Sequence, residues 1–415
     1  MFRHPLARAC VALAALLLAS LPAIAAEPIK IGFSMALTGA VAPNGKQVLA
    51  GFEIWRDDVN ARGGLLGRLV QLVYYDDQSN PANVPALYTK LLDVDKVDLV
   101  IGPYATNMVA PAMPVIIAHK KMTISILGLG VNRQFNYPRY FSTVPLGPEG
   151  PAAYSRGFFA LAMAQNPKPQ TVAIVAADAE FAKTSADGAR ANVKANGLKL
   201  VHDAKYPPNN TDFTSVMRGV QAASPDIVFA AAYPPDTVGI IRAAHEIGLV
   251  PKMFGGSFVG LFVTPIKMQL GPLINGIVLN ESFVPALNFP GSAELLAKYQ
   301  AKAPALGTDP LGYGFVPFAY AVGQLVAAAV EATQSLDDDK LAQYLHGHTV
   351  DTVVGPLAYG ADGEWKESRI LFTQFQHVTA SGDIAQFKDP KTEVILWPDQ
   401  YKNGTMIYPM SEAQK

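Results

Sequence analysis

The sequence predicts an α/β protein with two similar domains, and three observations lead to this fold class. Short β-branched runs alternate with amphipathic stretches of helical spacing along most of the chain. This alternation is typical of βαβ units and a parallel sheet. The pattern starts again after the Pro/Gly-rich stretch at 145–151 (PLGPEGP), and 415 residues are too many for one ordinary hydrophobic core.

The first half of the chain contains four predicted strands separated by helices. Residues 29–35 (IKIGFSM) alternate apolar and polar side chains as a strand does. Phe52, Trp55 and Val59 then recur at helical spacing, and Gly63-Gly64 ends that helix. The remaining predicted elements of this half are strands at 69–75, 98–101 and 122–127, with helices at 84–92 and up to residue 117.

The second half repeats this order. Buried strands are predicted at 172–176, 199–201 and 226–231, and helices at 181–195, 213–222 and 237–247. An Ala-rich helix at 316–333 is followed by the acidic run 337–339. We interpret that run as a loop and helix N-cap, with cation binding as the alternative.

The N-terminus has the features of a secretory signal peptide over residues 1–26. Arg3 and Arg8 make it positive, residues 11–18 form a small apolar run, and Ala23-Ile24-Ala25 is an Ala-x-Ala cleavage site. The apolar run is shorter than the ~20 residues that span a bilayer. We therefore expect the mature chain to begin near Ala26 or Glu27 and to be exported to the periplasm.

Composition and charge argue against several classes of function. The formal net charge is −1, without a basic surplus for nucleic acid. The only cysteine, Cys10, precedes the apolar run, so we expect neither a lipid anchor nor thiol chemistry nor disulfides in the mature chain. His346 and His348 lack further ligands at a matching spacing, and we predict neither a metal nor a cofactor.

The candidate site lies in the loops that follow the predicted strands, because open parallel sheets bind ligands beyond the carboxyl ends of their strands. These loops carry aromatic and hydroxyl side chains that suit a small pocket with apolar walls. Thr106 begins a predicted helix, where a ligand carboxylate could meet free N–H groups. The candidates from these loops are Asn44, Tyr104, Thr106, Phe181, Tyr233, Ser257 and Phe258.

Enzymatic alternatives rest on weaker patterns. Ser257 in FGGSFVG resembles the nucleophile elbow G-x-S-x-G, but Val259 replaces the closing glycine. His202 or His245 could be proposed as the base, which leaves a secreted serine hydrolase as a remote alternative. The glycines at 39, 45, 128 and 130 do not match G-x-G-x-x-G, so nucleotide binding is not predicted.

Several long stretches resemble the periplasmic leucine/isoleucine/valine-binding protein family, the type I solute-binding proteins of ABC importers. They are IKIGFSMALTG, AGFEIWRDDVNARGGLLGRLVQLVYYDDQSNP, VDLVIGP, AAYPPDTVGIIRAAHEIGL and VDTVVGPLAYGADGEWK. The resemblance implies a non-enzymatic receptor that delivers a solute to an inner-membrane permease and its ATPase. The alternative to transport is signalling, in which the ligand-bound protein presents itself to a receptor instead of to a permease.

The resemblance also implies two Rossmann-like lobes with parallel-rich sheets, joined by a hinge of three crossovers. We expect the crossovers near 143–150, 280–284 and 353–359. The N-terminal lobe would then comprise residues 27–145 plus 281–353. The C-terminal lobe would comprise residues 146–280 plus 354–415.

The family's ligand contacts can be transferred to positions of this chain. On the carboxylate side, Thr106 occupies the place of the family's hydroxyl residue. The next loop contributes Leu127, Gly128 and Leu129, with the family's threonine hydroxyl lost at Leu129. Phe181 and Tyr233 take the places of the second lobe's aromatic residues, and the family's early disulfide is absent, with Ser79 and Ala105 at its two positions.

The ammonium side of the site differs, because Ser257 stands where the family has a glutamate. An ammonium buried without a counter-charge costs several kcal/mol. We therefore expect a carboxylated ligand without an amine, of the benzoate or phenylpropanoid type. The alternative is a branched-chain or hydrophobic amino acid, or an amide, with another acidic residue such as Glu281 taking over the ammonium.

Overall fold

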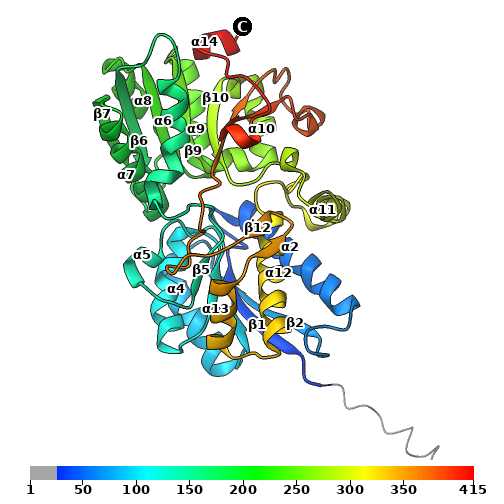
Figure 1. Ribbon diagram of the computed structural model, residues 1–415. Helices are drawn as coiled ribbons and strands as arrows, with labels where there is room; N and C mark the ends of the chain where they lie inside the picture. Colours follow the sequence, from blue (N-terminus) through cyan, green and yellow to red (C-terminus); the bar gives the residue numbers. More distant parts are fainter. Residues whose placement is uncertain (1–25) are drawn as a thin grey trace, which may run out of the picture.

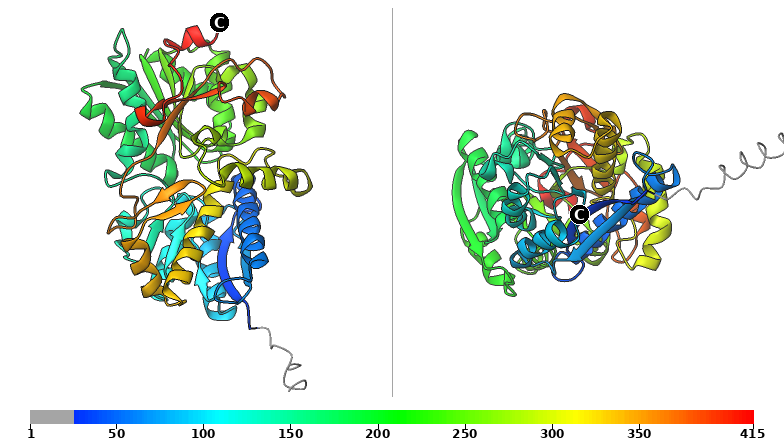
Figure 2. Two further views of the ribbon diagram at one scale, coloured as in Figure 1. Left: turned by 45° about the vertical axis from the view of Figure 1, so that its right-hand side comes forward. Right: turned by 90° about the horizontal axis from the view of Figure 1, so that it is seen from below.

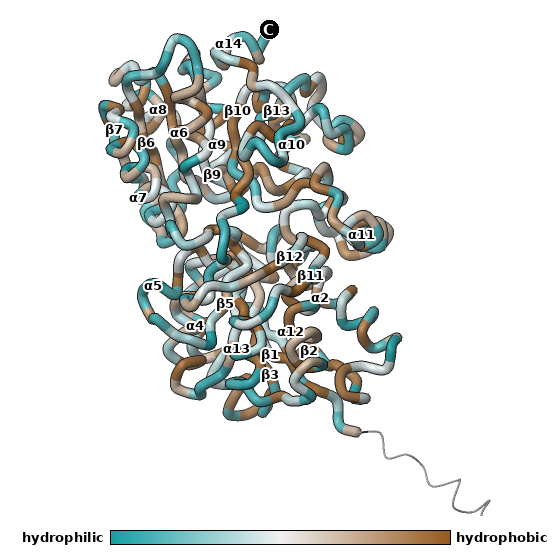
Figure 3. Tube along the Cα trace, in the orientation of Figure 1, coloured by the Kyte–Doolittle hydropathy of each residue, from teal (hydrophilic) through white to brown (hydrophobic). Residues whose placement is uncertain are grey.

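The protein folds into two α/β lobes stacked one on the other, each with its own sheet (Figure 1). The computed structural model describes residues 26–415. The signal peptide expected over residues 1–26 therefore lies, except for Ala26, outside the described residues. Hydrophobic segments concentrate in the strands at the centre of each lobe, with hydrophilic segments toward its surface (Figure 3).

The first lobe is built on a parallel sheet. Its strands are β1 (Ile29–Met35), β2 (Val70–Asp76), β3 (Leu99–Val100), β4 (Thr123–Ser125) and β5 (Tyr140–Ser142). The order β2-β1-β3 continues into β4-β5, because Gly102 N donates to Ile124 O at 3.0 Å and Tyr104 bridges to Ile126 in parallel. The resulting order is that of doubly wound folds with a ligand site at the strand ends.

Helices cover both faces of this sheet. They are α2 (Ala42–Ala61), α3 (Val84–Thr89), α4 (Thr106–Ala118), α5 (Asn132–Phe135), α11 (Ser292–Leu306), α12 (Val316–Thr333) and α13 (Asp338–Gly347). The helix α12 is the one described helix long and apolar enough to cross a membrane, but it packs against α2 in the lobe. A Cβ at Gly323 would lie 2.1 Å from the Trp55 ring, so glycine permits this close packing.

The second lobe repeats the same strand order. The parallel strands β6 (Thr171–Ala177), β7 (Lys199–Tyr206), β8 (Ile227–Ala232), β9 (Met253–Phe258) and β10 (Ile277–Glu281) lie in the order β7-β6-β8-β9-β10. Two strands, β13 (Leu371–Phe375) and β14 (Glu393–Trp397), extend the sheet antiparallel. The helices are α6 (Ala153–Met163), α7 (Glu180–Ala195), α8 (Phe213–Ala222), α9 (Pro234–Glu246), α10 (Thr264–Leu270) and α14 (Met410–Ala413).

The chain passes between the lobes three times (Figure 2). The first two passages run between β5 and α6 and between β10 and α11, and they overlap the ranges 143–150 and 280–284. The expected third passage at 353–359 is too early. The strands β11 (Val350–Thr352) and β12 (Gly355–Leu357) form a hairpin, and Trp365 Nε1 still donates to Ser142 O of the first lobe at 3.0 Å. The chain therefore crosses between Lys366 and Leu371.

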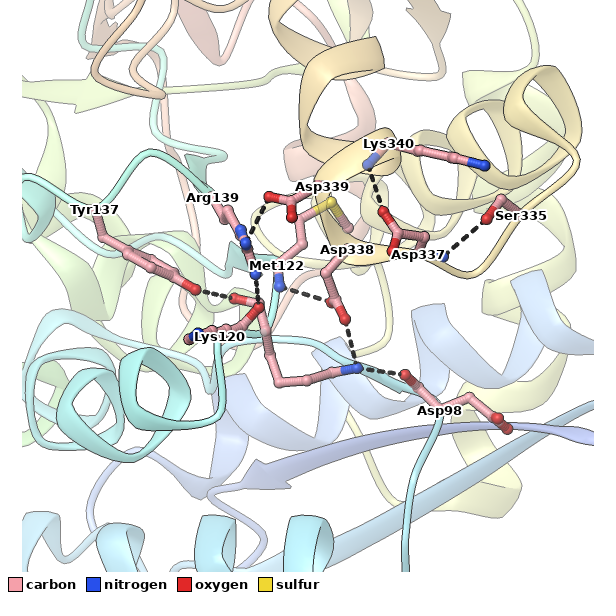
Figure 4. Close-up of polar contacts among 11 residues, drawn as sticks. Asp98, Lys120, Met122, Tyr137, Arg139, Ser335, Asp337, Asp338, Asp339 and Lys340 are labelled. Atoms are coloured by element: carbon pink, nitrogen blue, oxygen red, sulfur yellow. Dashed lines mark hydrogen bonds and ion pairs between the residues drawn. The ribbon is translucent and has the colours of Figure 1, made fainter.

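The acidic run at the start of α13 holds this helix to the first lobe (Figure 4). Asp337 caps the helix by accepting from Lys340 N at 3.0 Å, which confirms the predicted N-cap. Asp338 accepts from Lys121 Nζ and from Met122 N, each at 2.7 Å, and Asp339 pairs with Arg139 at 2.5 Å. These carboxylates thus serve as anchors of a helix.

Candidate ligand-binding site

A cavity lies where the strand ends of the two lobes face each other. The first lobe and the first passage contribute Val41, Tyr104, Ala105, Thr106, Leu127, Leu129 and Val144. The second lobe and the later segments contribute Tyr154, Phe181, Tyr233, Val259, Phe262, Glu281, Ser282, Gly314 and Phe315. The site is therefore shared by both lobes and two of the passages.

The first-lobe wall is suited to a carboxylate. The helix α4 begins at Thr106, after Ala105 at φ 80°, and its first N–H groups lack partners within the helix. Thr106 Oγ1 accepts from Leu129 N at 3.0 Å, which leaves its hydroxyl proton free to donate to a ligand. Leu127, also on the wall, has φ 52°. Left-handed non-glycine residues of this kind gather at ligand sites.

Aromatic rings form most of the remaining wall. Tyr104 meets Phe315 edge to face, with ring centroids 5.3 Å apart. On the opposite side Phe181 packs edge to face against Tyr233 at 5.8 Å and Tyr154 at 6.1 Å. Such rings give an apolar or aromatic ligand body a rigid surface to pack on.

One acidic side chain, Glu281, lines the cavity. It is the last residue of β10 and is 5% exposed. Burial raises the pKa of Glu281 well above its ordinary value, and the negative charge of Glu393 adds to that rise, while Lys267 opposes it. Lys267 pairs with Glu393 at 3.3 Å, so its charge is shared. The lining residues include no lysine or arginine.

The structure brings six of the ten expected site residues onto the cavity wall, namely Tyr104, Thr106, Leu127, Leu129, Phe181 and Tyr233. Asn44 lies behind the wall, where its Nδ2 donates to the Tyr104 hydroxyl at 2.7 Å. Gly128 also lies behind it, next to the Tyr140 hydroxyl. Phe258 is fully buried and packs against Phe254.

Ser257 does not line the cavity. It is fully buried on β9, and its Oγ lies 2.7 Å from Ser185 Oγ on α7. Its hydroxyl is paired with a serine of the same lobe. The structure thus places Ser257 behind the wall, whereas a replacement of the ammonium partner was expected at the wall. The strand β9 ends at Phe258, so Ser257 lies within the strand and not in the expected loop after it, and Val259 after the strand lines the cavity.

Several wall residues were missed by the sequence reasoning. Val144 and Ser282 lie within two of the passages that the resemblance implies, so the position of these passages could have indicated them as wall residues. Tyr154 lies on α6, which was not predicted, and Phe262 lies in a short turn after β9. Neither has a local pattern that separates a wall residue from core packing.

The two lobes touch directly beside the cavity. Asn107 Oδ1, on the first lobe, accepts from the Tyr233 hydroxyl at 2.9 Å and from Phe181 N at 3.1 Å, both on the second. Gln134 donates to Glu180 across the same gap at 3.1 Å. These contacts join the residues of the aromatic wall to the start of α4.

Two similar α/β lobes, three passages and a cavity between them at the strand ends define a two-lobed binding protein for a small molecule. A sequence profile described as "Periplasmic binding protein" matches residues 28–381, and the chain belongs to this family. It is a solute-binding protein of an ABC transporter, a periplasmic binding protein and not an enzyme.

Known proteins support this assignment. The chain is similar to the "Leu/Ile/Val-binding protein" of Escherichia coli (strain K12), 28% identical over 347 residues, which cover 82% of this chain and 89% of the relative. It superposes on LivJ of Streptococcus pneumoniae in complex with isoleucine with a TM-score of 0.74 at 20% identity, over 90% of this chain and 100% of that one. A solute-binding protein from R. palustris in complex with benzoate gives a TM-score of 0.74 at 19% identity, over 89% and 95%.

Proposed function

We propose that the protein captures a hydrophobic α-amino acid between its lobes and presents it to an inner-membrane permease with its ATPase. The observation that carries this proposal is Glu281, a buried carboxyl group on the wall of a cavity otherwise lined by apolar, aromatic and hydroxyl side chains. A ligand ammonium is the group that ionised Glu281 stabilises best in such surroundings.

The ligand's two charged ends then have separate partners. Its carboxylate meets Thr106 and the first N–H groups of α4, where the helix dipole favours an anion. Its ammonium meets Glu281, and its side chain packs among the rings of Tyr104, Phe181 and Phe315. The curated relative from E. coli carries the name Leu/Ile/Val-binding protein, which supports the same class of ligand.

An aromatic carboxylic acid is the second candidate. It is favoured by the aromatic wall and by the raised pKa of Glu281, since a protonated carboxyl group can donate to a ligand oxygen. The R. palustris neighbour was solved with benzoate. The two candidates differ in one respect, which is whether an amino group on the ligand strengthens or weakens binding.

Thermal unfolding of the ligand-stripped protein tests the proposal. Phenylalanine and leucine should stabilise it, whereas 3-phenylpropanoate, 4-methylpentanoate and benzoate should not at the same concentration. Ligand at 100 times its Kd adds about 2.7 kcal/mol. The variant Glu281→Gln should lose the response to amino acids because the counter-charge is gone. Stabilisation by the acids alone would establish the second candidate instead.

A further inference from the structure

A second cavity, open to solvent on one side, lies at the third passage and is separate from the ligand site. Three segments form its wall. They are the β11–β12 hairpin with its flanking residues in the first lobe, residues 365–369 at the passage, and residues 400–401 of the second lobe. The lining residues are Thr349, Pro356, Ala358, Trp365, Lys366, Glu367, Ser368, Arg369, Gln400 and Tyr401.

Arg369 is a buried cation in this wall. The residue is 7% exposed, and its guanidinium lies between the rings of Trp365 and Phe289, 4.7 and 4.8 Å from their centroids. One end of the guanidinium donates to Val354 O, but the buried Nε has no hydrogen-bond partner. In the described part of the chain Arg369 forms no ion pair. Burial lowers the pKa of Arg369 to about 10, and the neighbouring Tyr401 hydroxyl opposes this shift.

Two further donors surround the same cavity. The Ser368 Oγ is buried and also lacks a hydrogen-bond partner. Lys366 is exposed at the rim and has no ion pair among the described residues. The one acidic lining residue, Glu367, is exposed to solvent. A guanidinium, a hydroxyl and an ammonium group thus line one hollow, and its one carboxylate, Glu367, pairs with none of them among the described residues.

We propose that this cavity is a binding site for a small oxyanion, a phosphate or a carboxylate, held by Arg369, Ser368 and Lys366. A buried donor without a partner is costly, and an oxyanion supplies acceptors to both orphaned groups. Guanidinium and oxyanion form charge-assisted hydrogen bonds, which are the stronger class. Because Gln400 and Tyr401 come from the second lobe, the bound anion would lie between the two lobes at the hinge.

Calorimetric titration of the full mature protein with inorganic phosphate, and separately with acetate, tests the site. Chloride at the same ionic strength gives the baseline. We expect saturable binding of one anion per chain. The relative affinities for phosphate and acetate then show whether the site prefers a phosphate or a carboxylate. Lys366→Ala and Ser368→Ala should each weaken the Kd roughly three- to tenfold, and Arg369→Met should abolish binding.

Lys168→Ala is the matched control, since Lys168 is another exposed lysine outside any ion pair in the described chain. It should bind the anion as the wild type does. If Arg369→Met does not fold, Lys366→Ala and Ser368→Ala decide the matter. The proposal is overturned if neither anion binds beyond the chloride baseline, or if Lys366→Ala and Ser368→Ala both bind as Lys168→Ala does.

Discussion

Glu281 decides, at the scale of single residues, which charge a ligand can bring into the cavity. Its surroundings are arranged against ionisation: Glu393 on β14 and burial raise its pKa, and Lys267 on α10 compensates only in part because it is paired with Glu393. An amino acid must therefore bind the ionised form, which is the minority form below the raised pKa. Binding of an amino acid should release a proton.

The sign of the pH dependence follows. The affinity for phenylalanine should rise with pH above the ordinary carboxyl pKa, by at most about tenfold per unit, and level off once Glu281 is ionised in the free protein. The affinity for 3-phenylpropanoate should fall over the same range. Calorimetry at several pH values measures both, and an affinity for phenylalanine that falls with pH would contradict the role given to Glu281.

Ser257 serves as a structural residue. The change Ser257→Ala should lower the free energy of unfolding by about 0.5–1.5 kcal/mol, because the buried hydrogen bond to Ser185 is lost. Ligand affinity should stay within about twofold of the wild type, since the side chain is not on the wall. Urea unfolding and calorimetry check the two parts. In a double-mutant cycle Ser185→Ala should add little to Ser257→Ala.

The contrast between Ser257 and Glu281 shows what sequence reasoning at one position can and cannot do. The family pattern placed Ser257 in a loop after a strand, whereas Ser257 lies within β9 and its hydroxyl pairs with Ser185 of the same lobe. Glu281 was named as a substitute, and only the packing of β10 beside β9 brings it to the cavity. Thr106 was predictable because a helix start after a parallel strand has a fixed position relative to the sheet.

At the scale of elements, the helices α2 and α12 hold the first lobe together through close contact. Gly323→Ala would place a Cβ 2.1 Å from the Trp55 ring, so one helix must shift. We expect a loss of about 1–3 kcal/mol in the free energy of unfolding, measured by urea denaturation. Gly347→Ala, at the end of α13 with no atom within 4 Å of the added Cβ, should be neutral or nearly so. Equal losses in the two variants would contradict this account.

Elements with a strong local period were predicted well. The strand at 29–35 and the helices at 213–222 and 316–333 coincide with β1, α8 and α12. The strands β13 and β14 were not predicted, because antiparallel additions to a buried sheet edge depend on distant pairing. The parallel strand β10 was not predicted either. The third passage was placed too early for a related reason. The turn at 359–365 contacts the first lobe through long-range bonds that no local pattern reveals.

At the scale of the whole molecule, ligand capture depends on the approach of two lobes, and the contact of Asn107 with Tyr233 and Phe181 holds them together beside the cavity. Loss of this contact should shift the population toward open forms and reduce the apparent affinity in proportion.

Asn107→Ala should therefore weaken the Kd for the cleft ligand by about tenfold. X-ray scattering in solution should show a larger radius of gyration than the wild type at equal ligand concentration, with the thermal unfolding of the ligand-free protein little changed. Wild-type affinity in this variant would show that the contact plays no part in closure.

The central claim is that a buried carboxyl group between two lobes selects a ligand with an ammonium group. The measurement that tests it most directly is a calorimetric titration of the ligand-stripped wild type with phenylalanine and with 3-phenylpropanoate in one buffer near neutral pH. We predict that phenylalanine binds at least about tenfold more tightly, because only it can pair with Glu281. Tighter binding of 3-phenylpropanoate would contradict the claim and identify the protein as a receptor for aromatic acids.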